Sequence, residues 1–97
     1  MSRIVWTRSA EGDLHRLHRF LAQHDSIAAA RAITAIVEGV SRLAIFPALG
    51  RPAHDMPSEY RECFISFGDS GYLILYRVAS NRIAVLAIRH GRESGYE

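Results

Sequence analysis

Apolar residues recur at helical spacing in two segments of the first half of the chain. The first stripe consists of Ala10, Leu14, Leu17 and Leu21. The second follows Ile27 and consists of Ala30, Ile33, Ile36, Val37, Val40, Leu43 and Ala44. Steps of three and four residues place each set on one side of a helix. The pattern therefore predicts two helices, the first beginning near residue 9 and the second the longer.

Polar residues that can cap a helix precede both stripes. Thr7 and Ser9 are candidate N-caps for the first helix, and Asp25 or Ser26 can cap the second. Only the short polar stretch 23–26 separates the two helices. Such a short link makes them antiparallel neighbours, a helical hairpin whose apolar stripes must be buried against another layer.

Four other segments have the β-branched and aromatic residues that favour strands. They are Arg3 to Thr7, Tyr60 to Phe67, Tyr72 to Val78 and Ile83 to Ile88. Turn residues at 68–71 and 79–82 join the last three, and the proline-containing stretch 47–57 predicts an ordered loop. The element order is thus β-α-α-β-β-β. It predicts an α+β fold, with the helical hairpin packed on one face of a mostly antiparallel four-stranded sheet.

Composition limits the size of the domain and leaves the type of partner open. A chain of 97 residues with 48% hydrophobic content fits one domain, residues 1–97. All 12 basic residues are arginine, and the net charge is only +2. Arginine forks suit phosphate and carboxylate groups. So small a net charge favours neither nucleic acid nor an acidic protein.

Cys63 is the only cysteine, which excludes an intrachain disulfide and a cysteine-based zinc cluster. The N-terminal residues lack the apolar region of a signal peptide. No apolar run approaches the roughly 20 residues of a membrane span. We therefore expect a cytoplasmic protein without a membrane partner.

The common catalytic and cofactor motifs are missing from the sequence. His15 and His18 are three residues apart without the glutamate and third ligand of a metalloprotease motif. Neither a G-x-S-x-G context nor a glycine-rich phosphate loop is present. We therefore predict no metal site and no cofactor.

A basic cluster remains, on or just beyond the predicted sheet. It consists of Arg61, Arg77, Arg89, His90, Arg92 and Tyr96. Strand alternation places Arg89 and His90 on opposite faces, so only some members converge. The cluster is either a binding surface for a phosphate or an acidic partner, or a set of solvated strand ends whose arginine stems cover the sheet.

Several short motifs occur in the order found in one protein family. They are Trp6, Ala10 and Asp13-Leu14; Phe46-Pro47 and Gly50-Arg51; Arg61; Gly71-Tyr72; Tyr76-Arg77-Val78; and Ile88 to Arg92. On these residues the chain resembles, over nearly its whole length, the RelE/ParE superfamily of type II toxin-antitoxin toxins. That resemblance implies the same β-α-α-β-β-β fold.

The position after Gly71-Tyr72 separates the two branches of this superfamily. The ribosome-dependent members that cleave mRNA carry an arginine there, whereas this chain has Leu73. Loss of a guanidinium that would stabilise transition-state phosphate charge weakens the nuclease interpretation. The chain looks closer to the ParE branch. This implies a toxin that inhibits DNA gyrase by binding, without catalysis of its own, and that serves in systems such as those for plasmid stabilisation.

The resemblance also implies a cognate antitoxin that neutralises the toxin in a hetero-oligomer, with an amphipathic segment over the groove between helices and sheet. Two alternatives remain open. One is a ribosome-dependent mRNA endoribonuclease that uses Arg61, Arg92 and Tyr96, with His90 as a proton carrier. The other is a degenerate, non-toxic homologue that only binds an antitoxin.

Overall fold

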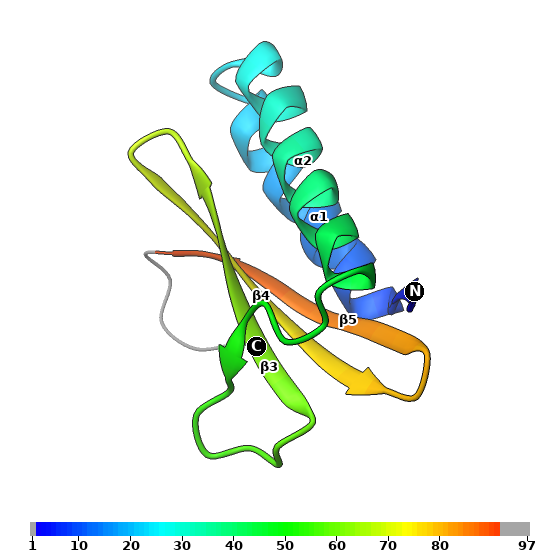
Figure 1. Cartoon of the computed structure of the whole chain (residues 1–97). Coiled ribbons are helices and arrows are strands. Elements are labelled where there is room, and N and C mark those ends of the chain that lie inside the picture. The colour runs from blue at the N-terminus through cyan, green and yellow to red at the C-terminus, as the bar shows by residue number, and fades with distance from the viewer. Residues whose placement is uncertain (1, 92–97) are drawn as a thin grey trace.

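The computed structural model describes residues 2–91, in which two antiparallel helices lie on one face of a sheet (Figure 1). The helical elements are α1 (Arg8–Ala22), α2 (Ser26–Ser41) and a short 3-10 helix, η1 (Arg42–Ala44). The strands are β1 (Arg3–Trp6), β2 (Arg51–Pro52), β3 (Tyr60–Phe67), β4 (Ser70–Ala79) and β5 (Arg82–His90).

The strands form one sheet in the order β1-β5-β4-β3-β2, with β1 parallel to β5 and the other pairs antiparallel. The predicted α+β class and the order of the two helices and the four longer strands are confirmed. The prediction of four strands is corrected to five, because the loop contains β2, in which Arg51 and Pro52 pair with β3. A two-residue strand has no alternation to detect, and proline lacks a backbone N–H, which restricts it to a sheet edge.

Side chains from the predicted caps fix the start of each helix. The Thr7 hydroxyl accepts a hydrogen bond from Ala10 N at 3.2 Å and donates one to Val85 O at 2.7 Å. Asp25 Oδ1 accepts from the backbone N–H groups of Ile27 and Ala28, each at 3.0 Å. Thr7 therefore begins α1 at Arg8, one residue before the expected position, and ties the helix to β5.

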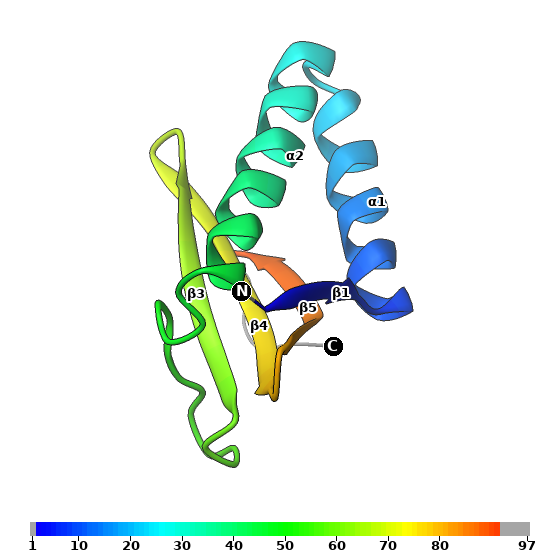
Figure 2. The same ribbon diagram turned by 45° about the vertical axis from the view of Figure 1, so that its right-hand side comes forward.

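The core lies between the helices and the face of the sheet that they cover, with α1 against β5 and α2 against β3 (Figure 2). Ile36 and Val40 of α2 meet Ile65 and Ile74 of the sheet within one buried cluster. Gly39 permits this close packing, because a Cβ atom there would lie 2.4 Å from Ile65 Cδ1.

A bulge in β5 decides which side chains face the helices. Tyr76 pairs with Val85 and Leu75 with Ala87, so the register shifts by one residue at Leu86. The Asp13 carboxylate accepts a hydrogen bond from Ile88 N at 2.8 Å beyond the bulge. Both Val85 and Ile88 are consequently buried in the helix-covered core, although they are three residues apart.

Candidate functional site

The residues of the predicted basic cluster do not gather on one face of the sheet. Arg61 and His90 lie on the helix-covered face, where they are in register with core residues. Arg77 and Arg89 lie on the far face, defined here as the side of the sheet opposite the helices. The separation of Arg89 from His90 follows the strand alternation that the sequence predicts.

Arg61 and His90 share a face but lie at opposite ends of β4. Arg61 pairs with Tyr76, and His90 pairs with Tyr72, four residues away along the strand. At a strand rise of about 3.3 Å per residue, about 13 Å separates these positions along β4. The His90 ring meets the Tyr72 ring edge to face, with 5.5 Å between their centroids. His90 is therefore far from the guanidinium of Arg61.

Arg92 and Tyr96, the other two predicted residues, lie outside the described range 2–91. Within that range, no group of three His, Cys, Asp or Glu side chains is placed to hold a metal ion. No helix of this part of the chain has the length and apolar character needed to cross a membrane.

Arg61 and Tyr76 together hold the loop that precedes β2. Arg61 Nη2 donates to Gly50 O at 2.6 Å and, more weakly, to Ala48 O at 3.4 Å. The Tyr76 hydroxyl donates to Pro47 O at 2.8 Å and accepts from Gly50 N at 3.0 Å. We call these two side chains the loop clamp. Because its guanidinium binds backbone carbonyls, Arg61 has a structural role here.

Three buried groups have pKa values above their ordinary range, for the same main reason. Burial raises the pKa of the Tyr76 and Tyr72 hydroxyls, and at Tyr76 the hydrogen bonds from Gly50 and Arg61 partly oppose it. Burial also raises the pKa of the Cys63 thiol, against a smaller opposing effect of the Arg42 charge. In each case the folded protein favours the neutral, protonated group.

The protein is therefore expected to lose stability in alkali. A raised folded-state pKa adds stability that is complete below the ordinary pKa, 9.0 for Cys63 and 10.0 for Tyr72, and that is lost as the pH rises through the folded value. Each group can lower the free energy of unfolding by up to about 1.4 kcal/mol per pH unit. Urea denaturation between neutral and strongly alkaline pH measures this slope. Tyr72→Phe should make it shallower, and an unchanged slope would contradict the assignment.

A groove opens where the clamped loop leaves the outer edge of β3. Its volume is about 830 Å³, and its lining includes Arg42, Phe46, Leu49, Phe64 and Leu73. The three exposed apolar side chains have 59% (Phe46), 51% (Leu49) and 53% (Phe64) of their surface accessible. We call this the β3-edge groove. Contiguous exposed apolar surface of this kind is typical of an interaction site.

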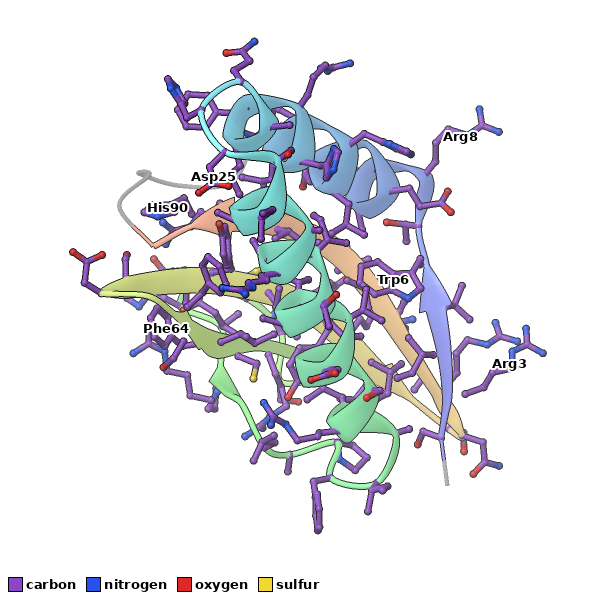
Figure 3. All side chains as sticks on the ribbon, turned by 90° about the horizontal axis from the view of Figure 1, so that it is seen from above. Arg3, Trp6, Arg8, Asp25, Phe64 and His90 are labelled. Atoms are coloured by element: carbon purple, nitrogen blue, oxygen red, sulfur yellow. The ribbon has the colours of Figure 1, made fainter. Side chains whose placement is uncertain are left out.

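The β3-edge groove was not predicted from the sequence, although β3 contains one signal for it. In β3, Cys63 and Ile65 are buried in the helix-covered core, and Phe64 breaks the alternation by placing an apolar ring on the other face. In Figure 3, Phe64 lies at the edge of the sheet away from Arg3 and Trp6 of β1. Phe46 and Leu49 had no such signal, because their loop has no regular period.

Leu73 is half-buried on the far face. It lies in register between Phe64 on one side and Arg89 on the other. Phe64, Leu73 and Arg89 thus form a row across three strands. Its centre is apolar, and its positive charge comes from Arg89.

Residues 4–95 match the family described as the ParE toxin of the type II toxin-antitoxin system parDE. Toxin RelE3 of Caulobacter vibrioides is 37% identical over 84 residues, which cover 87% of this chain and 88% of the relative. Toxin ParE3 of the same organism is 32% identical over 93 residues, covering 95% and 89%. Similar proteins thus carry both the RelE and the ParE name.

Solved structures share the architecture. A chain of the chromosomal ParDE system from P. aeruginosa superposes with a TM-score of 0.72 at 26% identity, covering 93% of this chain and 96% of the other. A chain of the toxin-antitoxin complex RelBE2 from Mycobacterium tuberculosis gives a TM-score of 0.67, covering 92% and 96%. At 22% identity, the second likeness concerns the fold alone.

Proposed function

Because this chain belongs to the ParE toxin family of type II toxin-antitoxin systems, we propose that it arrests growth by binding DNA gyrase, without catalysis of its own. The observation that supports this proposal is Leu73. At the position where the mRNA-cleaving branch carries arginine, the far face presents a half-buried aliphatic side chain.

The arrangement of the basic residues also favours binding over phosphate chemistry. Cleavage requires preorganised charges aimed at the point where negative charge develops. Among the described residues, Arg61 binds loop carbonyls, and His90 lies on the same face about 13 Å away along β4. Arg77 and Arg89 lie on the far face, Arg77 exposed and Arg89 half-buried. We propose that these two arginines belong to the gyrase-binding surface.

A cognate antitoxin would hold the toxin inactive in a hetero-oligomer in the cytoplasm. The structural neighbour from P. aeruginosa comes from a ParDE toxin-antitoxin system, which supports this partner. Exposed apolar residues, including Phe46, Leu49 and Phe64, provide surface that a protein partner would remove from water.

The proposal predicts that the purified toxin inhibits gyrase supercoiling in vitro and leaves mRNA on ribosomes intact. The cognate antitoxin should restore supercoiling. Arg77→Glu, a charge reversal on the far face, should raise the inhibitory concentration about tenfold. The matched control is Arg31→Glu, at an exposed arginine of α2, which should leave this concentration unchanged.

Other results would select the alternatives. Cut mRNA together with unimpaired supercoiling would establish the endoribonuclease. A toxin that affects neither reaction, and whose expression without antitoxin leaves growth normal, would be the degenerate homologue.

A further inference from the structure

The outer edge of β3 carries backbone groups that point away from the sheet. Val78 N donates to Glu59 O at 2.8 Å on the β4 side, whereas Ala53 N donates to Tyr60 O at 3.0 Å on the outer side. Successive residues of a strand direct their N–H and C=O groups to opposite sides. Phe64 and Ser66, which follow Tyr60 in steps of two, therefore present theirs at the outer edge.

Strand β2 covers only the beginning of this edge. It pairs with Arg61 and Glu62, and within residues 2–91 no strand pairs with the outer edge of β3 beyond that point, whereas β4 pairs with the inner edge throughout. The loop clamp explains why β2 cannot extend. Tyr76 and Arg61, on the helix-covered face, hold residues 47–50 toward that side. A segment that continued β2 would otherwise lie beside Phe64.

The surface beside this uncovered edge combines apolar and positive groups. On the far face, Phe64 and Leu73 form an apolar surface next to the edge. On the helix side, the Arg42 charge is close enough to Cys63 to affect the pKa of its thiol. Arg51 Nη2 contacts Glu62 Oε1 at 2.8 Å, with 75% of the arginine side chain exposed against 13% of the glutamate. The charge that the groove presents to a partner is therefore positive.

We propose that the β3-edge groove binds an extended segment of the cognate antitoxin, which adds to the sheet as a further strand beside Phe64 and Ser66. The segment would alternate apolar and acidic residues. Apolar side chains opposite Phe64 would contact Phe64 and Leu73, and the intervening acidic side chains would face Arg42. Main-chain hydrogen bonds would supply affinity and the alternating side chains specificity, as in other cases of strand addition. This inference rests on the antitoxin partner of the proposed function.

Charge argues against a second copy of the chain as the occupant. Two copies joined at this edge would bring the Arg42 and Arg51 side chains of each groove close to those of the other. Like charges across an interface oppose association. An acidic segment matches the same surface.

Amide hydrogen exchange of the full chain, with and without its purified full-length antitoxin, tests the proposal directly. The outward amides of Phe64 and Ser66 should exchange at least about 100-fold more slowly in the complex. The amides of Cys63 and Ile65 face β4 and should be protected in both states.

Paired variants test the side chains. Phe64→Glu should weaken antitoxin binding by about 30-fold, which corresponds to about 2 kcal/mol. Phe20→Glu, at an exposed phenylalanine of α1, should change binding less than about threefold. Arg42→Glu should weaken binding by about tenfold, with Arg31→Glu as its control. If Phe64→Glu failed to fold, amide hydrogen exchange at Phe64 and Ser66 of the unmodified chain would still test whether the antitoxin adds a strand.

The outcomes separate this inference from the proposed function. The added strand would be overturned if the antitoxin bound while the Phe64 and Ser66 amides stayed unprotected, and if each variant weakened antitoxin binding no more than its control. These results would leave the proposed gyrase inhibition unaffected. Protected amides in a toxin that does not affect gyrase would support the strand and refute the gyrase target. Protection that depends on toxin concentration without antitoxin would identify a second copy as the occupant. That result, or the absence of any antitoxin binding, would also overturn the inference.

Discussion

Replacement of Tyr76 by phenylalanine is expected to lower the free energy of unfolding by about 2–4 kcal/mol, although the ring itself remains buried. The hydroxyl serves two backbone groups of the clamped loop, Pro47 O at 2.8 Å and Gly50 N at 3.0 Å. Removal of one partner leaves each group unsatisfied, at about 1–3 kcal/mol apiece. The Tyr76 side chain is fully buried, so the phenylalanine ring can occupy the same site but has no hydroxyl to serve Pro47 O and Gly50 N.

Urea denaturation of Tyr76→Phe and Tyr72→Phe measures this effect against a matched control. Both rings are buried on the helix-covered face, but Tyr72 lies at the other end of β4, away from the loop. Tyr72→Phe should cost less than about 1 kcal/mol. Faster amide exchange at Gly50 in Tyr76→Phe would show that the loop has been released. The loop clamp would be refuted if Tyr76→Phe lowered the free energy of unfolding no more than Tyr72→Phe does.

Substitution of Gly39 by alanine is expected to lower the free energy of unfolding by about 1–3 kcal/mol. The new Cβ would lie 2.4 Å from Ile65 Cδ1 and 2.7 Å from Ile65 Cγ1, so α2 or the Ile65 side chain must shift. Ile65 is only 4% exposed and has core residues on its other sides, which limits how far it can move. The overlap outweighs the helix propensity that alanine adds.

Gly12 is the control, because it lies within α1 and a Cβ there would meet no atom within 4 Å. Gly12→Ala should raise the free energy of unfolding by about 0.5–1 kcal/mol, the ordinary helix preference for alanine. Addition of Ile65→Val to the Gly39→Ala chain should recover part of its loss, since it removes the overlapping Cδ1 atom. Equal stabilisation by alanine at both glycines would contradict the packing argument.

Much of the fold could be predicted from the sequence because it depends on local periodicity. Steps of three and four indicated both helices, and the segment from Tyr60 to Phe67, predicted as a strand from its aromatic and β-branched residues, matches β3. Thr7 and Asp25 cap the helices as the sequence suggested. Their competitors, Ser9 and Ser26, fall within the helices instead. The choice between adjacent candidates required tertiary contacts, such as the hydrogen bond from the Thr7 hydroxyl to Val85 O.

The candidate site was predicted less well, because strand alternation assigns faces and does not measure distances. Basic residues concentrated near the sheet indicated a cluster, but the bulge at Leu86 and the antiparallel register decide where each of them lies. Arg61 shows the difference most clearly. From the sequence, Arg61 was either a binding residue for a phosphate or an acidic partner or a solvated strand end, whereas in the structure its guanidinium binds the carbonyl of Gly50.

By itself, the sequence determined the order of the two helices and the four longer strands, the candidate helix caps, the α+β class and the resemblance to one toxin superfamily. Each of these depends on spacing within one element or on short motifs in order. Only the tertiary structure decided the fifth strand, the loop clamp and the β3-edge groove. The clamp hydrogen bonds join residues 11 and 29 positions apart, Arg61 to Gly50 and Tyr76 to Pro47. Contacts between residues so far apart have no sequence period, and they exist only once the sheet has brought the two segments together.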